Sequence, residues 1–171
     1  MAVDISDGAI VTYLSSPSFS VNKIANGLSQ NDFNELIEDK NKPFFDRAAQ
    51  GRYSPASTIK PAIGLFGLEN NIIDWDFTID DPGYFELPED GRIYRGWKKG
   101  GHGKINLQDA IIESSNTFFF SLAYKSEIEE LIKHLSYFGF GRNVCLDCFL
   151  PDNGLLPNPA WKMNTLNFGW F

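Results

Sequence analysis

The segment GRYSPASTIKPAIGLF, residues 51–66, constrains the fold more than any other part of the sequence. Apolar residues recur at helical spacing after Ser57, which predicts a buried helix from Ser57 to about Asn70. Pro61 lacks a backbone N–H, so it fits this helix only in the first turn, where that N–H would have no intrahelical partner. The helix must therefore begin close to Ser57, and Lys60 lies one turn further along the same face.

Ser57 and Lys60 form a pair that can support nucleophilic chemistry. A serine hydroxyl is a poor nucleophile near neutral pH and needs a neighbouring base. Lysine can be that base when burial lowers its pKa, and Ile59, Ile63 and Phe66 could supply the burial. Amide N–H groups at the helix N-terminus could also bind a developing oxyanion. The alternative is a capping serine beside a solvated lysine, which is the commoner reason for this tetrapeptide.

A second polar motif interrupts an apolar region in ESSNTFFF, where Ser114 and Asn116 lie between two predicted helices. Such a break can present a hydroxyl and an amide to a cleft. Taken alone, it is more commonly a polar turn whose serine and asparagine cap the helices.

The remaining patterns predict a helix-dominated α+β fold. Two hairpins are expected, one within residues 3–14 and one around Asp90-Gly91. Further helices are predicted in the segments 31–40, 106–114, 117–125 and 126–139. The last should begin with a capping box and end at a glycine, formed by Ser126, Glu129 and Gly139. Loops are expected over 15–30 and 140–171, and no repeat or second domain is evident.

Composition excludes several classes of protein. The 171 residues are 43% hydrophobic and 15% aromatic, which is typical of a globular chain with a real core. The formal charge of −7 argues against nucleic-acid binding, because phosphate recognition needs a basic face. The longest apolar runs are too short to span a bilayer, and no export signal is visible at the start.

The two cysteines, Cys145 and Cys148, form a single C-x-x-C. A zinc site would need a second pair of ligands, and a redox motif would need a βαβ setting. Neither is evident, so a zinc-binding or redox-active protein is the least favoured class of function. Incidental cysteines, or a strained local disulfide in an oxidising compartment, are the other interpretations.

S-x-x-K followed by S-x-N resembles the signature of the penicillin-recognising serine enzymes. YSPASTIKP is similar to the segment around the active-site serine of class B penicillin-binding proteins. Residues 81–124, from DPGYFELPEDG to FFFSLAY, resemble the elongation-type branch, penicillin-binding protein 2. The segments DGAIVTYLSSPSFSVN and FGFGRNVCLDCFLPDNGLLPNPAWK are similar to the same branch in the same order.

This resemblance implies a D,D-transpeptidase that cross-links peptidoglycan stem peptides through an acyl-enzyme, without a metal or organic cofactor. Ser57 would attack the D-Ala-D-Ala carbonyl, with Lys60 as its general base. Ser114 would relay a proton to or from the leaving amine, and Asn116 would bind both Lys60 and the substrate amide. β-Lactams would acylate Ser57 in place of the stem peptide. The implied partners are elongation-complex membrane proteins, and the implied location is the periplasmic face of the inner membrane, with the anchor outside this chain.

The sequence departs from the family by containing neither K-T-G nor K-S-G, the third motif of these enzymes. That motif lies on an edge strand, where it binds the substrate carboxylate and its strand contributes an oxyanion-hole N–H. We therefore expect residues 1–171 to be the N-terminal part of a transpeptidase domain, lacking most of the central sheet and weak or inactive alone. The expected origin is a truncated form, a split gene or a degenerate product. A catalytically inactive remnant with a structural or interaction role is the alternative function. A serine β-lactamase would share Ser57 and Lys60 but needs a base that activates the deacylating water, and this sequence offers no clear candidate for that base.

Two smaller departures involve the residues around the motifs. Ala56 stands where the family usually has glycine, and a positive φ there would strain it by about 1 kcal/mol. Some elongation-type relatives resemble one another in a zinc cluster of two aspartates, a histidine and a cysteine. Asp81 and His102 match two of those positions, but Gly96 and Ser115 occupy the other two. A structural zinc is therefore not expected, and His102 is interpreted as a loop histidine.

Overall fold

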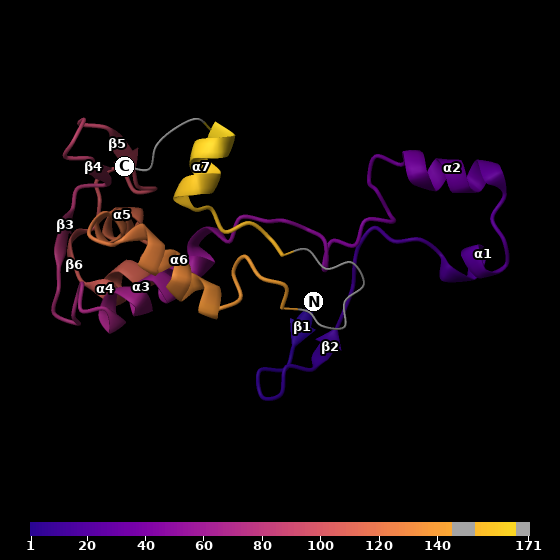
Figure 1. The fold of residues 1–171 in the computed structure, drawn as a ribbon, viewed down its shortest axis with the longest axis horizontal. Coiled ribbons are helices and arrows are strands. Elements are labelled where there is room, and N and C mark those ends of the chain that lie inside the picture. The colour runs from indigo at the N-terminus through magenta and orange to yellow at the C-terminus, as the bar shows by residue number, and fades with distance from the viewer. Residues whose placement is uncertain (145–152, 167–171) are drawn as a thin grey trace. The chain divides into compact units, whose positions relative to one another are not determined.

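The computed structural model describes residues 1–144 and 153–166. These residues form an α+β structure dominated by helices, as predicted, and they divide into two compact units. One unit contains Met1–Tyr53, and the other contains Ser54–Arg142 together with the C-terminal helix α7 (Pro159–Leu166). Figure 1 shows that helices α3 to α6 and strands β3 to β6 gather in the second unit.

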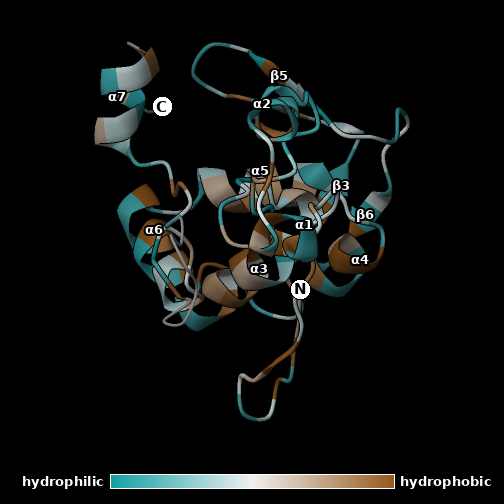
Figure 2. Cartoon of the chain, turned by 90° about the vertical axis from the view of Figure 1, so that its right-hand side faces the viewer, coloured by the Kyte–Doolittle hydropathy of each residue, from teal (hydrophilic) through white to brown (hydrophobic). Residues whose placement is uncertain are grey.

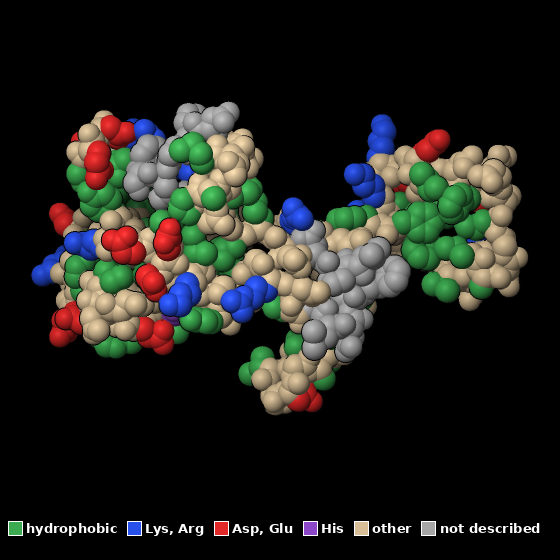
Figure 3. All heavy atoms as spheres, in the orientation of Figure 1, with side chains coloured by type: hydrophobic (Ala, Val, Ile, Leu, Met, Phe, Trp, Pro, Cys, Tyr) green, Lys and Arg blue, Asp and Glu red, His purple; other side chains and the backbone are tan. Residues whose placement is uncertain are grey.

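The first unit contains a hairpin and two short helices. Strands β1 (Ala2–Val3) and β2 (Ile10–Thr12) pair antiparallel, which confirms the first predicted hairpin. Helix α2 (Gln30–Glu38) confirms the helix predicted in the segment 31–40, but α1 (Val21–Ala25) lies where a loop was expected. Serine side chains cap both helices, so a local hydrogen bond supports even the five-residue α1. Figure 3 shows apolar side chains on the outside of the part that carries α1 and α2.

The second unit is built around the helix predicted from Ser57 to about Asn70, although its α-helical part begins only at Lys60. A 3₁₀ turn, η1 (Ala56–Ile59), leads directly into α3 (Lys60–Glu69), with Pro61 in the first turn. Three more helices follow: α4 (Leu107–Ile112), α5 (Asn116–Tyr124) and α6 (Ile128–Tyr137). They confirm the predicted helices, whereas α7 lies in a segment expected to be loop.

The capping box predicted for the start of α6 is wrong. The N-cap of α6 is Glu127, which makes no side-chain capping bond. Ser126 instead donates from Oγ to the Leu122 carbonyl at 2.7 Å, because the end of α5 also leaves carbonyls without intrahelical partners. The predicted stop is confirmed, since Gly139 follows α6 with φ 86°.

The strands of the second unit form two antiparallel pairs. Strand β4 (Tyr84–Glu86) pairs with β5 (Ile93–Arg95), which confirms the hairpin around Asp90-Gly91. Strand β3 (Ile79–Asp81) pairs with β6 (Gly103–Ile105), a long-range pairing that was not predicted. Across residues 1–144 and 153–166, every sheet has two strands.

Two apolar clusters hold the helices of this unit together. One joins α4 and α5 to the β6 strand and consists of Ile73, Ile105, Leu107, Ala110, Phe118, Phe119 and Leu122. The other joins α3 to α6 through Phe66, Leu131 and Leu135. Figure 2 shows the apolar residues along α4 and α6.

Two glycines bring α3 close to its neighbours. Gly64 and Gly67 follow Lys60 at helical spacing and are buried with it. A Cβ on Gly64 would lie 2.9 Å from a Leu107 methyl carbon, and a Cβ on Gly67 would lie 2.9 Å from a Leu122 methyl carbon. The face of α3 that carries Lys60 therefore packs closely against α4 and α5.

Candidate active site

Ser57 and Lys60 occupy different environments at the start of α3. Ser57 lies in η1 and is exposed, whereas the Lys60 side chain is only 8% exposed. Neither η1 nor α3 receives a side-chain capping bond, so Ser57 is not a helix cap. The alternative of a capping serine beside a solvated lysine is therefore wrong for this pair.

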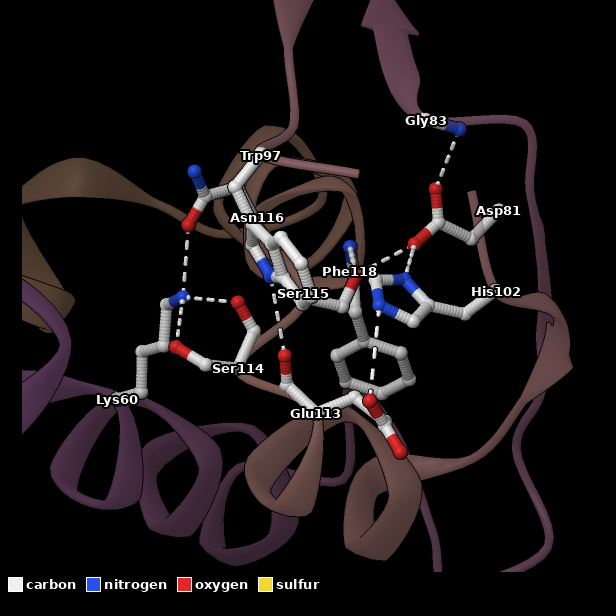
Figure 4. A network of polar contacts seen from close by, with 10 residues as sticks. All are labelled: Lys60, Asp81, Gly83, Trp97, His102, Glu113, Ser114, Ser115, Asn116 and Phe118. Carbon is white, nitrogen blue, oxygen red and sulfur yellow. Dashed lines mark hydrogen bonds and ion pairs between the residues drawn. The ribbon is translucent and has the colours of Figure 1, made fainter. Parts of the chain in front are cut away.

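The Lys60 ammonium group contacts the second polar motif, as Figure 4 shows. Its Nζ lies 2.7 Å from the Ser114 carbonyl oxygen, 3.0 Å from Ser114 Oγ and 2.7 Å from Asn116 Oδ1. The first of these contacts joins residues 54 positions apart. The fold thus brings together S-x-x-K and S-x-N, which the sequence keeps separate.

Burial lowers the pKa of Lys60 from its ordinary value of 10.5. All three acceptors around Nζ are neutral, so no opposite charge offsets the loss of water around the ammonium group. The face of the Phe119 ring lies near Nζ, with its centroid 5.6 Å away. The ring face attracts the ammonium form, so it is the loss of water around Nζ that favours a lysine able to lose its proton and act as a base.

Ser114 connects Ser57 to this lysine. The Oγ atoms of Ser57 and Ser114 are 2.9 Å apart, and Ser114 Oγ is 3.0 Å from Lys60 Nζ. Each hydroxyl can donate one hydrogen bond and accept another, so a proton can pass along this chain in either direction. Among the described residues, the hydrogen-bonded route from Ser57 to Lys60 runs through Ser114.

The position of Ser114 follows from how α4 ends. The Ser115 N–H donates to the Ala110 carbonyl at 3.0 Å, and the Ser114 N–H donates to the Ile111 carbonyl at 3.3 Å. This is the Schellman arrangement, in which the residue after the C-cap adopts a positive φ and is usually glycine. Ser114 adopts φ 53° there, so a hydroxyl-bearing residue occupies a strained position beside Lys60.

We expect Ser114→Gly to raise the free energy of unfolding by about 1 kcal/mol, because glycine adopts this positive φ without strain. Chemical denaturation of the two proteins measures the difference. Ser121→Gly, in the middle of α5, is the matched control, and it should lower the stability by about 1 kcal/mol. Equal destabilisation by both changes would contradict the assignment of strain to Ser114.

Ala56 also adopts a positive φ, of 48°. The backbone strain expected for an alanine with positive φ is therefore present one residue before Ser57, in a conformation that favours glycine. Strained residues thus lie next to or within both motifs of the site.

Asp81, His102 and Ser115 form a buried hydrogen-bonded cluster behind the motif (Figure 4). Asp81 is 2% exposed, and its Oδ2 lies 2.7 Å from both Ser115 Oγ and His102 Nδ1. Its Oδ1 accepts a hydrogen bond of 2.7 Å from the Gly83 N–H. Burial alone would raise the pKa of the Asp81 carboxyl, but the bonds from His102, Ser115 and Gly83 together hold it below 3.8.

This cluster does not fit a zinc ion. A structural zinc takes four ligands, and of the four candidate positions only Asp81 and His102 carry a side chain that zinc commonly binds. The structure shows no group of three potential ligands within residues 1–144 and 153–166. Gly96 supplies no ligand atom from a side chain, and its N–H donates to the Gly83 carbonyl at 2.8 Å. His102 lies in the loop before β6, but its side chain is buried.

Two features of the site were not predicted. The packing role of Gly64 and Gly67 could have been read from their spacing of four and seven residues after Lys60. The bond from Trp97 Nε1 to the Glu113 carbonyl, at 3.1 Å, has no local signal in the sequence. Cys145 and Cys148 lie outside the described residues, and no helix within those residues is long and apolar enough to cross a membrane.

Comparisons with known proteins agree with the geometry. The family model described as the penicillin binding protein transpeptidase domain matches residues 1–170. Peptidoglycan D,D-transpeptidase MrdA of Acinetobacter baumannii is 42% identical over 170 residues, which cover 99% of this chain and 25% of that protein. The Escherichia coli protein of the same name is 34% identical over 171 residues, covering 100% of this chain and 27% of its own length. The chain therefore spans about a quarter of the length of these relatives.

Solved structures show the same likeness. Pseudomonas aeruginosa PBP2, in complex with WCK 5153, superposes with a TM-score of 0.85 at 37% identity, over 92% of this chain and 36% of that one. Helicobacter pylori PBP2, in complex with MreC, superposes with a TM-score of 0.83 at 34% identity, over 92% of this chain and 29% of that one. The expected resemblance to penicillin-binding protein 2 is thus confirmed. Because the family model covers nearly every residue, this chain belongs to the penicillin-binding protein transpeptidase family.

Proposed function

We propose that this chain carries the acylating half of a D,D-transpeptidase site that acts on peptidoglycan stem peptides. The observation that carries the proposal is the continuous path from the exposed Ser57 hydroxyl through Ser114 to the buried Lys60. A hydroxyl linked to a desolvated amine is the arrangement that makes serine nucleophilic. The relatives named peptidoglycan D,D-transpeptidase supply the class of substrate.

In the proposed acylation, Ser57 Oγ attacks the carbonyl carbon between the two D-alanines. The serine proton passes through Ser114 Oγ to the neutral Lys60 amine, which becomes an ammonium. When the tetrahedral intermediate collapses, the C–N bond breaks and the same proton returns through Ser114 to the leaving D-alanine amine. An amine of a second stem peptide then attacks the ester carbonyl. The new C–N bond forms, the bond to Ser57 Oγ breaks, and the proton lost by the attacking amine passes through Lys60 and Ser114 to Ser57 Oγ.

Asn116 is proposed to hold both the base and the substrate. Its Oδ1 accepts from Lys60, and Figure 4 shows the amide nitrogen pointing away from that lysine. An amide N–H in this direction can donate to a carbonyl oxygen of the stem peptide. Asn116 is the first residue of α5, so its backbone is fixed by the helix.

We further propose that residues 1–171 are part of a larger transpeptidase domain. The sequence contains no Lys-Thr/Ser-Gly motif, so the carboxylate clamp and one oxyanion donor of the family have no counterpart in it. Loss of one oxyanion donor typically slows catalysis by about 10²–10³-fold. The chain alone should therefore acylate slowly, and the same absence favours the second candidate, an inactive remnant with a structural role.

The proposed partners follow from the relatives. The Helicobacter pylori structure is a complex of PBP2 with MreC, and another similar structure is described as a peptidoglycan synthase complex. We propose that this chain works with elongation-complex proteins of that kind at the periplasmic face of the inner membrane. β-Lactams are proposed to acylate Ser57, as ligands that mimic D-Ala-D-Ala.

Labelling with a fluorescent penicillin tests this function. The purified chain is incubated with the reagent, and intact mass followed by peptide mapping locates any adduct. An adduct on Ser57 that is lost in Ser57→Ala but retained in Ser54→Ala supports the acylating site. A correctly folded chain that forms no adduct after long incubation supports the inactive remnant instead.

A further inference from the structure

We propose that Trp97 and Asp81 are positioning residues that hold Ser114 from its two sides, and so set the reactivity of Ser57. Asp81 is the last residue of β3 and Trp97 lies between β3 and β6, so both are outside the two motifs. The inference rests on the proposed function, since it concerns how fast the same hydroxyl is acylated. It assigns a role in the reaction to residues that make no contact with Ser57 or Lys60 among the described hydrogen bonds.

The first anchor is a hydrogen bond from Trp97 to the residue before Ser114. Trp97 Nε1 donates at 3.1 Å to the carbonyl of Glu113, the C-cap of α4. The last carbonyls of a helix lack intrahelical partners, so this one is free to accept an external donor. The Trp97 side chain is 62% exposed, so burial in the core does not account for its placement.

The second anchor holds the residue after Ser114. Ser115 is 1% exposed, and its Oγ donates to Asp81 Oδ2 at 2.7 Å while accepting the Phe118 N–H that caps α5. A hydrogen bond from a hydroxyl to a buried carboxylate is short and strong. The start of α5 is thereby tied to the end of β3.

His102 links the two anchors. Its Nδ1 lies 2.7 Å from the Asp81 carboxylate, and its ring packs edge-on against Trp97 with the centroids 5.6 Å apart (Figure 4). The two anchors thus belong to one connected group of side chains. A shift of either one is transmitted to the other.

The anchors matter because Ser114 is strained and bears two of the three acceptors of Lys60. Its φ of 53° is strained, so its backbone would move toward a negative φ if it were not held. Both its carbonyl oxygen and its Oγ contact Lys60 Nζ. Trp97 holds the carbonyl of the residue before Ser114, and Asp81 holds the side-chain hydroxyl of the residue after it. If one anchor is lost, Ser114 can relax, and the path from Ser57 to Lys60 lengthens. A displacement of about 1 Å at a reacting group can slow a reaction by about 10²-fold.

The test compares Trp97→Phe with Trp75→Phe. Phenylalanine at position 97 keeps an aromatic ring but removes the N–H that binds Glu113, and Trp75 is a similarly exposed tryptophan outside this network, 65% exposed. Acylation of Ser57 by a fluorescent penicillin is measured at several concentrations to separate the acylation rate constant from the affinity of the non-covalent complex. Hydrogen exchange is measured in peptides covering residues 113–116 and, separately, α6.

We expect Trp97→Phe to lower the acylation rate constant about 10- to 100-fold with little change in affinity. Exchange at 113–116 should become about 10-fold faster, while exchange in α6 stays the same. The pair Ser115→Thr and Ser115→Val tests the second anchor, because the two side chains have the same shape and only threonine keeps the hydroxyl. Ser115→Thr should keep most of the acylation rate of the unmodified chain, whereas Ser115→Val should lose it.

Three outcomes separate the explanations. If Trp97→Phe matches Trp75→Phe in both measurements, the positioning role is wrong. If Leu131→Ala, which destabilises the α3–α6 contact, slows acylation as much, general loss of stability explains the effect and the proposal is again overturned. If even the unmodified chain forms no adduct but Trp97→Phe still speeds exchange at 113–116, the proposed function fails and the positioning role is supported.

Discussion

Replacing Lys60 with methionine is expected to lower the rate of Ser57 acylation by about 10³-fold. Methionine fills a similar volume but cannot accept the serine proton, and general base catalysis typically contributes about 10²–10⁴-fold. Stopped-time labelling with a fluorescent penicillin measures the rate in both proteins. Lys98→Met is the matched control, because that lysine is exposed, and its acylation rate should equal that of the unmodified chain.

The pH dependence of the same reaction distinguishes a base from a purely structural lysine. Burial lowers the pKa of Lys60, so its neutral, reactive form becomes populated at a lower pH than for an ordinary lysine. The acylation rate should therefore rise with pH and level off, with an inflection below 10.5. The inflection should vanish in Lys60→Met. A rate that shows no inflection at any pH below 10.5 would argue against deprotonation of Lys60 as the activating step.

Replacing Asp81 with alanine is expected to have the largest effect on stability, lowering the free energy of unfolding by about 3–5 kcal/mol. The carboxylate accepts from Ser115, His102 and the Gly83 N–H, and its loss leaves these donors buried without their acceptor. Urea unfolding followed by circular dichroism measures the change. Asp80→Ala removes an exposed carboxylate from the same strand and should change the stability by less than about 0.5 kcal/mol. Similar losses in both variants would rule out the cluster as their cause.

The contribution of the Asp81 carboxylate to stability should also depend on pH. The folded state holds the pKa of Asp81 below 3.8, so protons bind the unfolded chain more readily at this group. Its contribution to stability is therefore fully present above pH 3.8 and is lost as the pH falls through the lower, folded value. Between these two values the unmodified protein should lose stability more steeply than Asp81→Ala. Parallel acid curves for the two proteins would contradict the shift.

The site combines strain with burial in a way that suits a reactive centre. Ala56 and Ser114 both hold positive φ values next to or within the motifs, and Lys60 is buried among neutral acceptors. Each arrangement costs stability, and each is maintained by the surrounding packing. Ser114→Gly illustrates that stability and reactivity are opposed here, because it should stabilise the fold while removing the hydroxyl between Ser57 and Lys60.

Local chemistry was sufficient to predict the elements that carry the motifs. Pro61 located the start of α3, the polar break at 114–116 separated α4 from α5, and Asp90-Gly91 located a hairpin. These features depend on sterics and hydrogen bonds within a few residues, so the sequence contains them directly. Short helices such as α1 and α7 were missed, because a few residues of ordinary composition give little periodic signal.

By itself, the sequence determined that Ser57 and Lys60 lie one turn apart where a helix begins, that a break presents Ser114 and Asn116, and which family the chain resembles. Only the tertiary structure decided that these motifs meet, with Lys60 Nζ 2.7 Å from Asn116 Oδ1. It also decided that Asp81, His102 and Trp97 support the break from behind. These contacts depend on how closely α3 packs on α4 and α5 and on the pairing of β3 with β6. Such long-range packing is set by the whole core, and no short stretch of residues specifies it.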